Sequence, residues 1–343
     1  MKIKVVLFII ICCVVTAFIN LDDSLFKIPD NWPKPKYDFS KNPLSKEKIE
    51  LGRVLFYDPI LSKDSSVSCN SCHSQYTAFA HVDHALSHGI NNKIGKRNAP
   101  ALANIAWESS FMWDGSVAHL DDQPLAPINN PDEMDEDMNA ILIKLNRSSI
   151  YPDLFNKAFG NHSVSQENVL KAISQFMVTI TSSNSKYDSV MRHQTIFTDQ
   201  ETNGYKLFQQ NCSSCHKEPL FTSNQYENNG LAFDTTLNDI GRMKVTKDIT
   251  DSMKFKVPTL RNLEFSYPYM HDGRFKKISD VLKHYTSGIK KSNPLSSKLE
   301  KPIVLSSSEK VDLTAFLLAL TDRSFLFNQK YSYPKEILNK AQN

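Results

Sequence analysis

The sequence predicts a mainly α-helical protein made of two similar domains. Its 343 residues suit two hydrophobic cores, because a single domain usually spans about 100–200 residues. Apolar residues recur with helical spacing in several segments, and no alternating run is long enough for a sizeable sheet. The pattern Cys-x-x-Cys-His occurs twice, at residues 69–73 and 212–216. We therefore expect one domain at residues 43–185 and a second at residues 195–325.

The composition is that of a globular protein, and the charge alone names no partner. Hydrophobic residues make up 41% of the chain and charged residues 22%. The net charge of +3 is too small to indicate a nucleic acid or an anionic membrane as partner.

Residues 1–20 have the pattern of an export signal. Two lysines precede an apolar run that ends at Phe18, as in the first two regions of a secretory signal. This run is shorter than the ~20 residues that a helix needs to cross a bilayer, so we expect cleavage and a periplasmic protein. Two alternatives stay open, namely membrane anchoring through an uncleaved signal and lipid attachment at Cys12 or Cys13.

The first half begins with an extended lead-in. Residues 21–37 are rich in Pro, Lys and Asp, and we expect the fold to begin near Pro43. Ser45 is placed to cap a helix that runs through Phe56. The helix should stop near Asp58, because the residue before a proline disfavours helical geometry.

The second half carries two capping signals. The segment from Thr198 to Glu201 has the spacing of a capping box before a helix that leads into the second motif. A last helix is predicted to begin after Ser306, with Glu309 three residues on, and to run to Leu320.

Short phrases recur in the two halves in the same order. Pro100 to Asn104 and Met112 to Gly115 align without a gap on Pro258 to Asn262 and Met270 to Gly273. Such internal similarity is typical of a duplicated unit. We expect the boundary between the two copies in the polar stretch at residues 181–194.

The cysteines indicate covalent haem rather than disulfides. Of six, two lie in the export signal and four in the motifs, so none remains for a structural disulfide. In Cys-x-x-Cys-His the thiols bond to the haem vinyl groups and the histidine binds the iron. A zinc site built from both cysteine pairs is the alternative, but it does not explain the histidine after each pair. We expect two haem c groups in cytochrome c-like domains, bound by Cys69, Cys72 and His73 and by Cys212, Cys215 and His216.

Six phrases along residues 43–325 match one protein family in sequence and in order. They are Leu51 to Asp58, Ser68 to His73, Arg97 to Pro100, Trp113 to Gly115, Pro258 to Asn262 and Pro268 to Gly273. On these phrases the chain resembles the bacterial di-haem cytochrome c peroxidases and their MauG-type relatives, which mature methylamine dehydrogenase. The resemblance implies two facing α domains, a peroxide site at the N-terminal haem and electron entry at the C-terminal haem.

The same resemblance implies catalytic roles for Trp113, Gln123 and Glu133 and a place in the peroxide pocket for Pro127. Trp113 lies where the family has a Trp that links the two haems, while Gln123, Pro127 and Glu133 lie at the positions of its peroxide pocket. A carboxylate within reach of both peroxide oxygens can move the proton that O–O cleavage requires, and Gln123 can orient it or a water. From the residues alone, Glu133 is one charge in a solvated acidic run and Trp113 an ordinary buried aromatic residue.

His88 is the candidate sixth ligand of the first haem. Family peroxidases carry at this position a His that caps the haem and must leave before peroxide binds. Two additional residues between His88 and Arg97 make this segment similar to relatives whose peroxide haem stays open. His81 and His84 are alternative ligands, and a solvent-exposed His is the simplest alternative.

Tyr285 replaces the usual methionine ligand of the second haem, twelve residues after the His-Asp-Gly phrase. Tyr is the MauG pattern, and a phenolate oxygen favours ferric or higher-valent iron. A buried Tyr285 with Met243, Met253 or Met270 as ligand is the alternative, and Met270 is least favoured because its counterpart in the first half is Met112.

A calcium ion between the domains is implied by the resemblance. By position it would use the side chain of Asn98 and the carbonyl oxygens of Ser266 and Pro268, and oxygen ligands suit this hard cation. Ordinary turn residues are the alternative.

These features together predict a periplasmic peroxidase that reduces hydrogen peroxide with electrons from a small cytochrome c or copper protein. One alternative is a MauG-like enzyme that oxidises side chains of a protein partner, which Tyr285 favours. Another is a non-catalytic electron carrier with two protein ligands on each iron. Relatives are often dimers, so a homodimer is a further expectation.

Overall fold

The protein is described by a computed structural model at residues 25–160, 164–291 and 294–341. The predicted export signal at residues 1–20 lies outside these ranges, with Cys12 and Cys13. None of the helices in the described ranges is long and apolar enough to cross a membrane.

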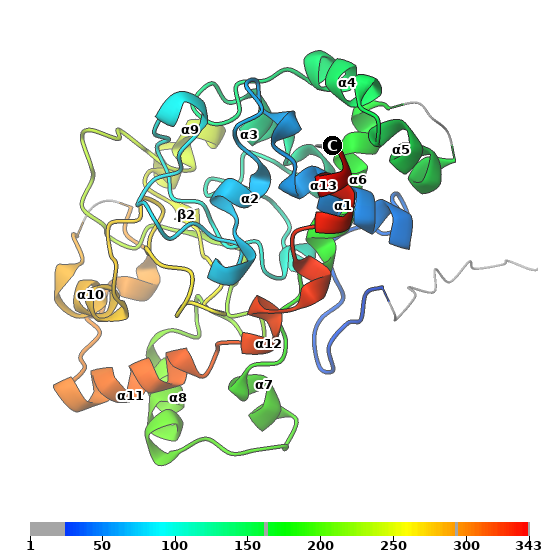
Figure 1. Ribbon diagram of the computed structural model, residues 1–343. Helices are drawn as coiled ribbons and strands as arrows, with labels where there is room; N and C mark the ends of the chain where they lie inside the picture. The colour runs from blue at the N-terminus through cyan, green and yellow to red at the C-terminus, as the bar shows by residue number, and fades with distance from the viewer. Residues whose placement is uncertain (1–24, 161–163, 292–293, 342–343) are drawn as a thin grey trace, which may run out of the picture.

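The fold is mainly α-helical, as predicted (Figure 1). The helices of the first half are α1 (Lys46–Tyr57), α2 (Cys69–Cys72), α3 (Leu125–Asn129), α4 (Met138–Arg147), α5 (Tyr151–Phe159) and α6 (Gln166–Thr179). Those of the second half are α7 (Lys186–Met191), α8 (Asp199–Asn211), α9 (Met243–Thr246), α10 (Ile278–Lys283), α11 (Ser307–Leu318), α12 (Arg323–Leu326) and α13 (Lys335–Ala341). Single 3-10 turns lie at Pro59–Leu61, Gln75–Thr77, Ile90–Asn92, Ile105–Trp107, Leu120–Asp122, Ile249–Asp251, Ser297–Leu299 and Gln329–Tyr331.

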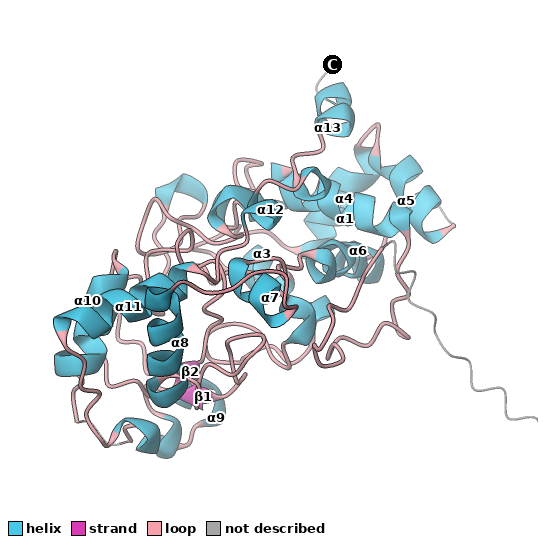
Figure 2. Cartoon of the chain, turned by 90° about the horizontal axis from the view of Figure 1, so that it is seen from below, coloured by secondary structure: helices cyan, strands magenta, loops and turns pink. Residues whose placement is uncertain are grey.

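Strands are almost absent from the described ranges. The two-residue strands β1 (Tyr226–Glu227) and β2 (Phe255–Lys256) pair antiparallel and form the only sheet there. Long loops connect the helices throughout the described chain (Figure 2).

The predicted helix starts are confirmed. Ser45 caps α1, and its side chain accepts a hydrogen bond from the Lys48 amide. Thr198 and Glu201 form the expected capping box before α8, with both reciprocal hydrogen bonds present. The same arrangement at Ser306 opens α11.

Each half is organised by one helix crossing. The helix that precedes the haem-binding motif packs against the last long helix of the same half, α1 on α6 and α8 on α11 (Figure 1). A glycine lies at each crossing. A Cβ at Gly52 would lie 1.9 Å from the Ala172 carbonyl oxygen, and one at Gly204 would lie 2.0 Å from the Asp312 carbonyl oxygen. Glycine is required because the backbones approach too closely for a side chain.

The folded part of the chain extends beyond the predicted domain limits at both ends. Phe26 is 3% exposed, and its ring packs against Trp107 at 5.5 Å, so the fold begins well before Pro43. At the other end, Tyr331 is 1% exposed and belongs to the core of the first half. The chain therefore crosses back to the first half after α11.

Helix α7 was not predicted. It lies within residues 181–194, which we expected to be a polar connection. Ser185 and Asp188 form a capping box at its start. Asp188 also forms a bidentate ion pair with the fully buried Arg261, at 2.7 and 2.8 Å, which fixes α7 to the core of the second half.

The two copies of the repeat contact one another reciprocally. The Asn98 amide donates to the His271 carbonyl oxygen at 2.7 Å, and the Lys256 amide donates to the Trp113 carbonyl oxygen at 2.7 Å. In the repeat alignment Asn98 is equivalent to Lys256 and Trp113 to His271. The two halves are thus joined by the same pair of bonds made twice, which confirms the internal repeat in three dimensions.

Candidate active site

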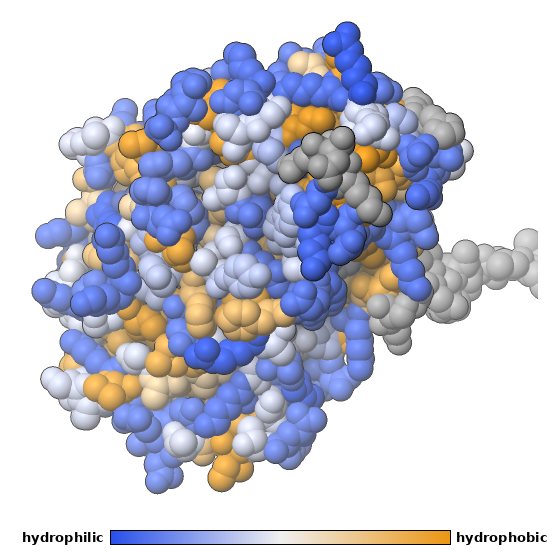
Figure 3. All heavy atoms as spheres, viewed as in Figure 1, coloured by the Kyte–Doolittle hydropathy of each residue, from blue (hydrophilic) through white to orange (hydrophobic). Residues whose placement is uncertain are grey.

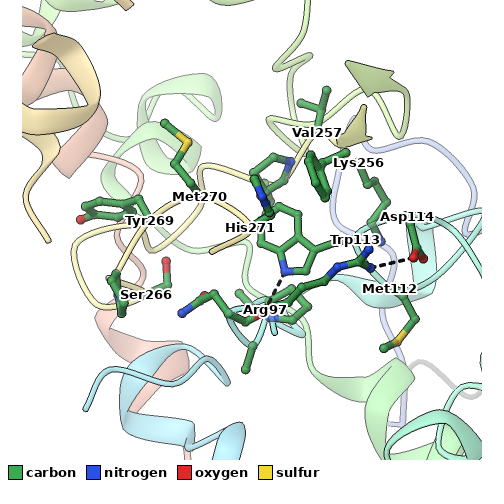
Figure 4. Close-up of a pocket in the computed structure, with 18 of the residues that line it drawn as sticks. Arg97, Met112, Trp113, Asp114, Lys256, Val257, Ser266, Tyr269, Met270 and His271 are labelled. Carbon is green, nitrogen blue, oxygen red and sulfur yellow. Dashed lines mark hydrogen bonds and ion pairs between the residues drawn. The ribbon is translucent and has the colours of Figure 1, made fainter. Parts of the chain in front are cut away.

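A single cavity of about 890 Å³ runs between the two halves and is lined by both Cys-x-x-Cys-His motifs. Its walls also include Trp113, Arg97 and His271, whose side chains meet at its centre (Figure 4). The four motif cysteines form no disulfide, as expected. In the described ranges no three His, Cys, Asp or Glu side chains converge as a metal site.

The histidines of the motifs are prepared to bind a metal through Nε2. His73 Nδ1 donates to the Phe79 carbonyl oxygen at 2.9 Å, and His216 Nδ1 lies 3.1 Å from the carbonyl oxygens of Phe221 and Pro258. A hydrogen bond to one ring nitrogen fixes the tautomer and leaves the other free as a ligand. Burial lowers the pKa of both imidazoles to about 4, so both are neutral at pH 7.

Local structure places the two motifs against the cavity. Helix α2 contains the first pair of cysteines and begins with a capping box between Ser68 and Ser71, while the second pair directly follows α8. Each motif presents two free thiols and one imidazole of fixed tautomer to a cavity with mostly apolar walls. These groups fit two covalently bound haems, one at each motif.

Glu133 lies in the cavity wall next to the first motif. Burial raises the pKa of its carboxyl group, against a hydrogen bond from Asn130 that lowers it. Burial also raises the pKa of the Cys72 thiol to about 11, and the Glu133 charge adds to this rise, so the two side chains lie close together. Among the described residues no Lys or Arg forms an ion pair with Glu133.

The rest of the acidic run has structural contacts instead. Asp135 forms an ion pair with Lys63 at 3.0 Å, and Glu136 forms one with Lys144 at 2.6 Å. Asp137 caps α4 through the Ala140 amide. Glu133 therefore differs from its acidic neighbours, because they form ion pairs or a helix cap, whereas Glu133 lines the cavity.

Gln123 and Pro127 line the cavity on the same side as Glu133. The Gln123 side-chain amide lies 3.8 Å from the Met112 sulfur and donates to it. The Pro127 carbonyl oxygen accepts from the Met134 amide at 3.2 Å, which ties helix α3 to the loop that carries Glu133. The structure therefore brings together the three positions predicted for the peroxide pocket.

Trp113 lies where the two halves touch. Its side chain is 8% exposed, and its indole Nε1 donates to the Asn98 carbonyl oxygen at 2.8 Å (Figure 4). Beside it the His271 ring stacks on Phe255, with ring centroids 3.6 Å apart and an angle of 10° between the planes. This position fits both the predicted link between haems and an ordinary interface aromatic.

Arg97 reinforces this contact between the halves. Its guanidinium binds Asp114 at 2.7 Å and Asp239 at 2.6 Å. Because Asp239 belongs to the other half, Arg97 is an ionic bridge across the cavity. The sequence showed Arg97 only as part of a family phrase, and nothing in the sequence pairs it with Asp239.

Tyr285 lines the cavity at the second motif. It lies in a π-helical turn, His284–Gly288, that follows α10, and such turns are frequent at functional sites. Burial raises the pKa of its phenol to about 12, the charges of Cys212 and Cys215 contribute to the rise, and a hydrogen bond from Asn229 opposes it. The phenol thus lies against both thiols of the second motif.

The alternative methionine ligands are less well placed. Met270 lines the cavity, but its sulfur accepts a hydrogen bond from Asn229 at 3.4 Å, and Met243 and Met253 do not belong to the lining. Asn229 therefore contacts both Tyr285 and Met270. No sequence signal identified Asn229, because its role depends on contacts between distant loops.

His88 lies at the first motif, with its carbonyl oxygen 3.6 Å from the Cys72 sulfur. His88 is among the residues that line the cavity, and its ring stacks on His84, with centroids 3.9 Å apart. His81 and His84 do not line the cavity. The loop is also held close to Glu133, because a Cβ at Gly89 would lie 2.4 Å from the Glu133 carbonyl oxygen.

The three residues predicted for calcium all line the cavity. The Asn98 side-chain amide donates to the Ala85 carbonyl oxygen at 3.0 Å, which orients its oxygen away from Ala85. Ser266 and Pro268 lie in the loop that leads to His271 (Figure 4 labels Ser266). The calcium site stays a prediction.

Known proteins resemble this chain over most of its length. Residues 46–196 match the family described as di-haem cytochrome c peroxidase. Methylamine utilization protein MauG of Methylorubrum extorquens is 34% identical over 307 residues, covering 86% of this chain and 83% of that protein. Cytochrome c551 peroxidase of Nitrosomonas europaea is 35% identical over 236 residues, covering 67% and 70% of the two chains.

Solved structures agree with the fold. A MauG-like protein associated with microbial copper homeostasis superposes with a TM-score of 0.80 at 30% identity, covering 90% of this chain and 99% of that one. The diheme peroxidase BthA from Burkholderia thailandensis superposes with a TM-score of 0.72 at 21% identity, a likeness that shows the fold alone.

Proposed function

Because this chain belongs to the di-haem cytochrome c peroxidase family and is a haem peroxidase, we propose that it reduces hydrogen peroxide to water in the periplasm. Two electrons from a small cytochrome c or copper protein, two protons and one peroxide molecule give two water molecules. Bound haem supplies the redox-active iron that accepts the electrons and passes them to peroxide.

The observation that carries this proposal is Glu133 in the cavity wall beside the first motif. Its carboxylate takes the proton from one oxygen of peroxide and delivers it to the other, which then leaves as water. Burial raises the pKa of Glu133, and a higher pKa brings a carboxyl group closer to the range in which it exchanges protons readily near neutral pH.

Gln123 and Trp113 support this chemistry. The Met112 sulfur holds the Gln123 amide group, so that its carbonyl oxygen can accept a hydrogen bond from peroxide or water. Trp113 shortens the path for electrons between the two motifs, because its ring is fixed at the contact of the two halves by the Asn98 carbonyl oxygen. A carrier with no catalytic activity would have no use for Glu133.

A MauG-like reaction on a protein partner is the second candidate, and Tyr285 favours it. The phenol lies against the second motif, and a tyrosinate ligand would hold that haem at a lower potential than a methionine would. The 34% identity to a MauG protein supports the same candidate.

Stopped-flow spectroscopy of the purified protein with peroxide separates these functions. Rapid oxidation of a reduced cytochrome c added with the peroxide supports the peroxidase. A long-lived change in the haem spectrum that persists with the reduced cytochrome c present supports the MauG-like enzyme. If neither haem responds to peroxide or cyanide after partial reduction, both enzyme functions are wrong.

A further inference from the structure

The second haem site is enclosed by an unusually basic segment. Residues 274–301 contain eight Lys and Arg residues but only two carboxylates, Asp280 and Glu300. Five lysines in this segment are exposed and form no ion pair within the described ranges: Lys276, Lys277, Lys283, Lys290 and Lys291. We call these five residues the lysine patch.

The lysine patch belongs to the segment that forms one wall of the second haem site, and its five side chains are exposed. On the inner side of the same segment, Ile278, Val281 and Leu282 of α10 line the cavity together with Tyr285. Lys298 of the same segment also lines the cavity, where it forms an ion pair with Glu227 at 2.5 Å, so it is not part of the unpaired basic surface. Lys283 lies on α10, and Lys276 and Lys277 directly precede this helix, so about one helix diameter, ~10 Å, separates these three lysines from the cavity.

The surface view agrees with this arrangement. Hydrophilic side chains project where Figure 1 places α10, at the left edge of the molecule (Figure 3). All five lysines of the patch are exposed, so a partner can reach them.

The opposite charge lies at the first haem site. Residues 121–137, which carry Gln123 and Glu133, contain seven carboxylates and no Lys or Arg. Lysines from elsewhere pair with only two of them, Asp135 and Glu136. Of these carboxylates Asp132 and Glu133 line the cavity, and the exposed Lys96 lines it as well. The clear excess of one charge therefore lies in the basic segment at the second motif.

The lysine patch distinguishes ligands by charge. Hydrogen peroxide is neutral and is not attracted to it, whereas a protein with an acidic face is. Charge patches of this kind steer protein encounter and raise association rates, an effect that salt removes.

We infer that the lysine patch is the docking surface for an electron-donor protein that presents an acidic face. This inference rests on the proposed peroxidase function and adds the charge of the partner to it. The location next to the second motif favours an electron donor over an anionic membrane, because docking there brings the donor close to the haem that is to receive the electron.

The test compares two donors that differ only in surface charge. Native mitochondrial cytochrome c is basic around its haem edge, and its succinylated form is acidic. Steady-state peroxide reduction is measured with each donor at low and at physiological ionic strength, with hydroquinone as an uncharged reductant that needs no docking. We expect the succinylated donor to give a kcat/KM at least about tenfold higher than the native donor at low salt, and the difference to shrink as salt is added.

A pair of charge-reversal variants assigns the effect to the patch. Lys276→Glu/Lys277→Glu/Lys283→Glu should lower kcat/KM for the succinylated donor about tenfold and leave the rate with hydroquinone unchanged. The matched control Lys27→Glu/Lys34→Glu/Lys36→Glu changes the net charge equally at exposed lysines of the N-terminal segment and should have little effect.

Three results would overturn the inference. The first is a higher kcat/KM of the wild type with the native donor than with the succinylated donor. The second is an equal loss of kcat/KM in both variants. The third is a patch variant that keeps its rate with the succinylated donor but no longer binds vesicles of anionic lipid. The last result would assign the patch to a membrane surface. Absence of turnover even with hydroquinone in the wild type would instead contradict the proposed peroxidase function itself.

Discussion

At the scale of single residues, Glu133 is the side chain on which the proposed chemistry depends most. Replacing it by Gln keeps the shape of the side chain but removes its capacity to accept a proton, so we expect peroxide turnover to fall at least about tenfold. Turnover with a reduced cytochrome c measures this. Asp122→Asn, which neutralises an exposed carboxylate of the same acidic stretch, is the control and should leave turnover unchanged. Equal rates for Glu133→Gln and the wild type would remove Glu133 from the mechanism.

The pH dependence of the reaction follows from the same residue. Glu133 must be ionised to accept a proton, and burial raises its pKa. The acid limb of kcat/KM should therefore lie at higher pH than the ordinary glutamate value of about 4.3, with activity lost as the pH falls through it. This limb should disappear in Glu133→Gln. A limb that persists in the variant belongs to another group.

Tyr285 can be tested by spectroscopy without any turnover. If its phenol oxygen binds the second iron, Tyr285→Phe should change the absorption and electron paramagnetic resonance spectra of that haem and raise its reduction potential. Met270→Leu is the control, because it removes the competing ligand. A spectrum that changes in Met270→Leu but not in Tyr285→Phe would show that the methionine is the ligand.

The residues that the sequence predicted for the site lie together, while their roles stay predictions. Both motifs, Trp113, Gln123, Glu133 and Tyr285 line one cavity. The resemblance named these positions from local phrases. It could not predict that Asn229 contacts Tyr285 or that Arg97 binds Asp239. Such contacts join loops that are distant in sequence, and no local pattern records them.

At the scale of helices, the glycines at the two crossings are the features most open to test. Alanine in place of an exposed helical glycine usually stabilises by about 1 kcal/mol. At Gly52 and Gly204, however, the added Cβ would overlap a carbonyl oxygen of the partner helix, so the clash should outweigh that gain. We expect Gly52→Ala and Gly204→Ala each to lower the free energy of unfolding by about 1–3 kcal/mol.

Denaturant unfolding of the holoprotein, followed by circular dichroism, measures this loss. Asn203→Ala is the control for Gly204→Ala, since Asn203 is the exposed neighbour on α8 and alanine there should be neutral or slightly stabilising. Unchanged stability of both glycine variants would mean that the helices can separate enough to admit a methyl group.

Helix starts were predictable where a side chain caps the backbone locally. Ser45, Thr198 and Ser306 opened helices as expected. Ser185 and Asp188 have the same geometry, but Asp is not the Glu or Gln of the usual box, and the surrounding residues are polar. Helix α7 is stable because Asp188 binds Arg261 in the core, a tertiary contact that the sequence does not show.

At the scale of the whole molecule, the C-terminal segment joins the two halves. Tyr331 follows the last long helix of the second half, yet its hydroxyl donates to the Thr179 carbonyl oxygen at 2.7 Å, and its own carbonyl oxygen accepts from Tyr57 at 2.7 Å. Both partners belong to the first half. The domain limits at residues 43–185 and 195–325 therefore stay a prediction about the repeat units, while the folded molecule extends beyond them.

Tyr331→Ala should consequently destabilise the whole molecule. Emptying a fully buried aromatic site costs about 3–5 kcal/mol, and Tyr333→Ala, at a side chain that is 42% exposed, should cost far less. Differential scanning calorimetry measures both. We expect the Tyr331→Ala transition to move to lower temperature as one peak, and a second peak at the original temperature would show that the halves unfold independently.

The contact between the two halves resembles the interface of a symmetric dimer. Asn98 bonds to His271 and Lys256 bonds to Trp113, so the same pair of repeat positions is joined twice, as in an isologous interface. Two separate copies would have to meet by diffusion, and their pairing would weaken on dilution. Fusion into one polypeptide makes the pairing independent of concentration. It also frees each copy to evolve alone, so that one subunit-like half could acquire an indole where the other retains an imidazole.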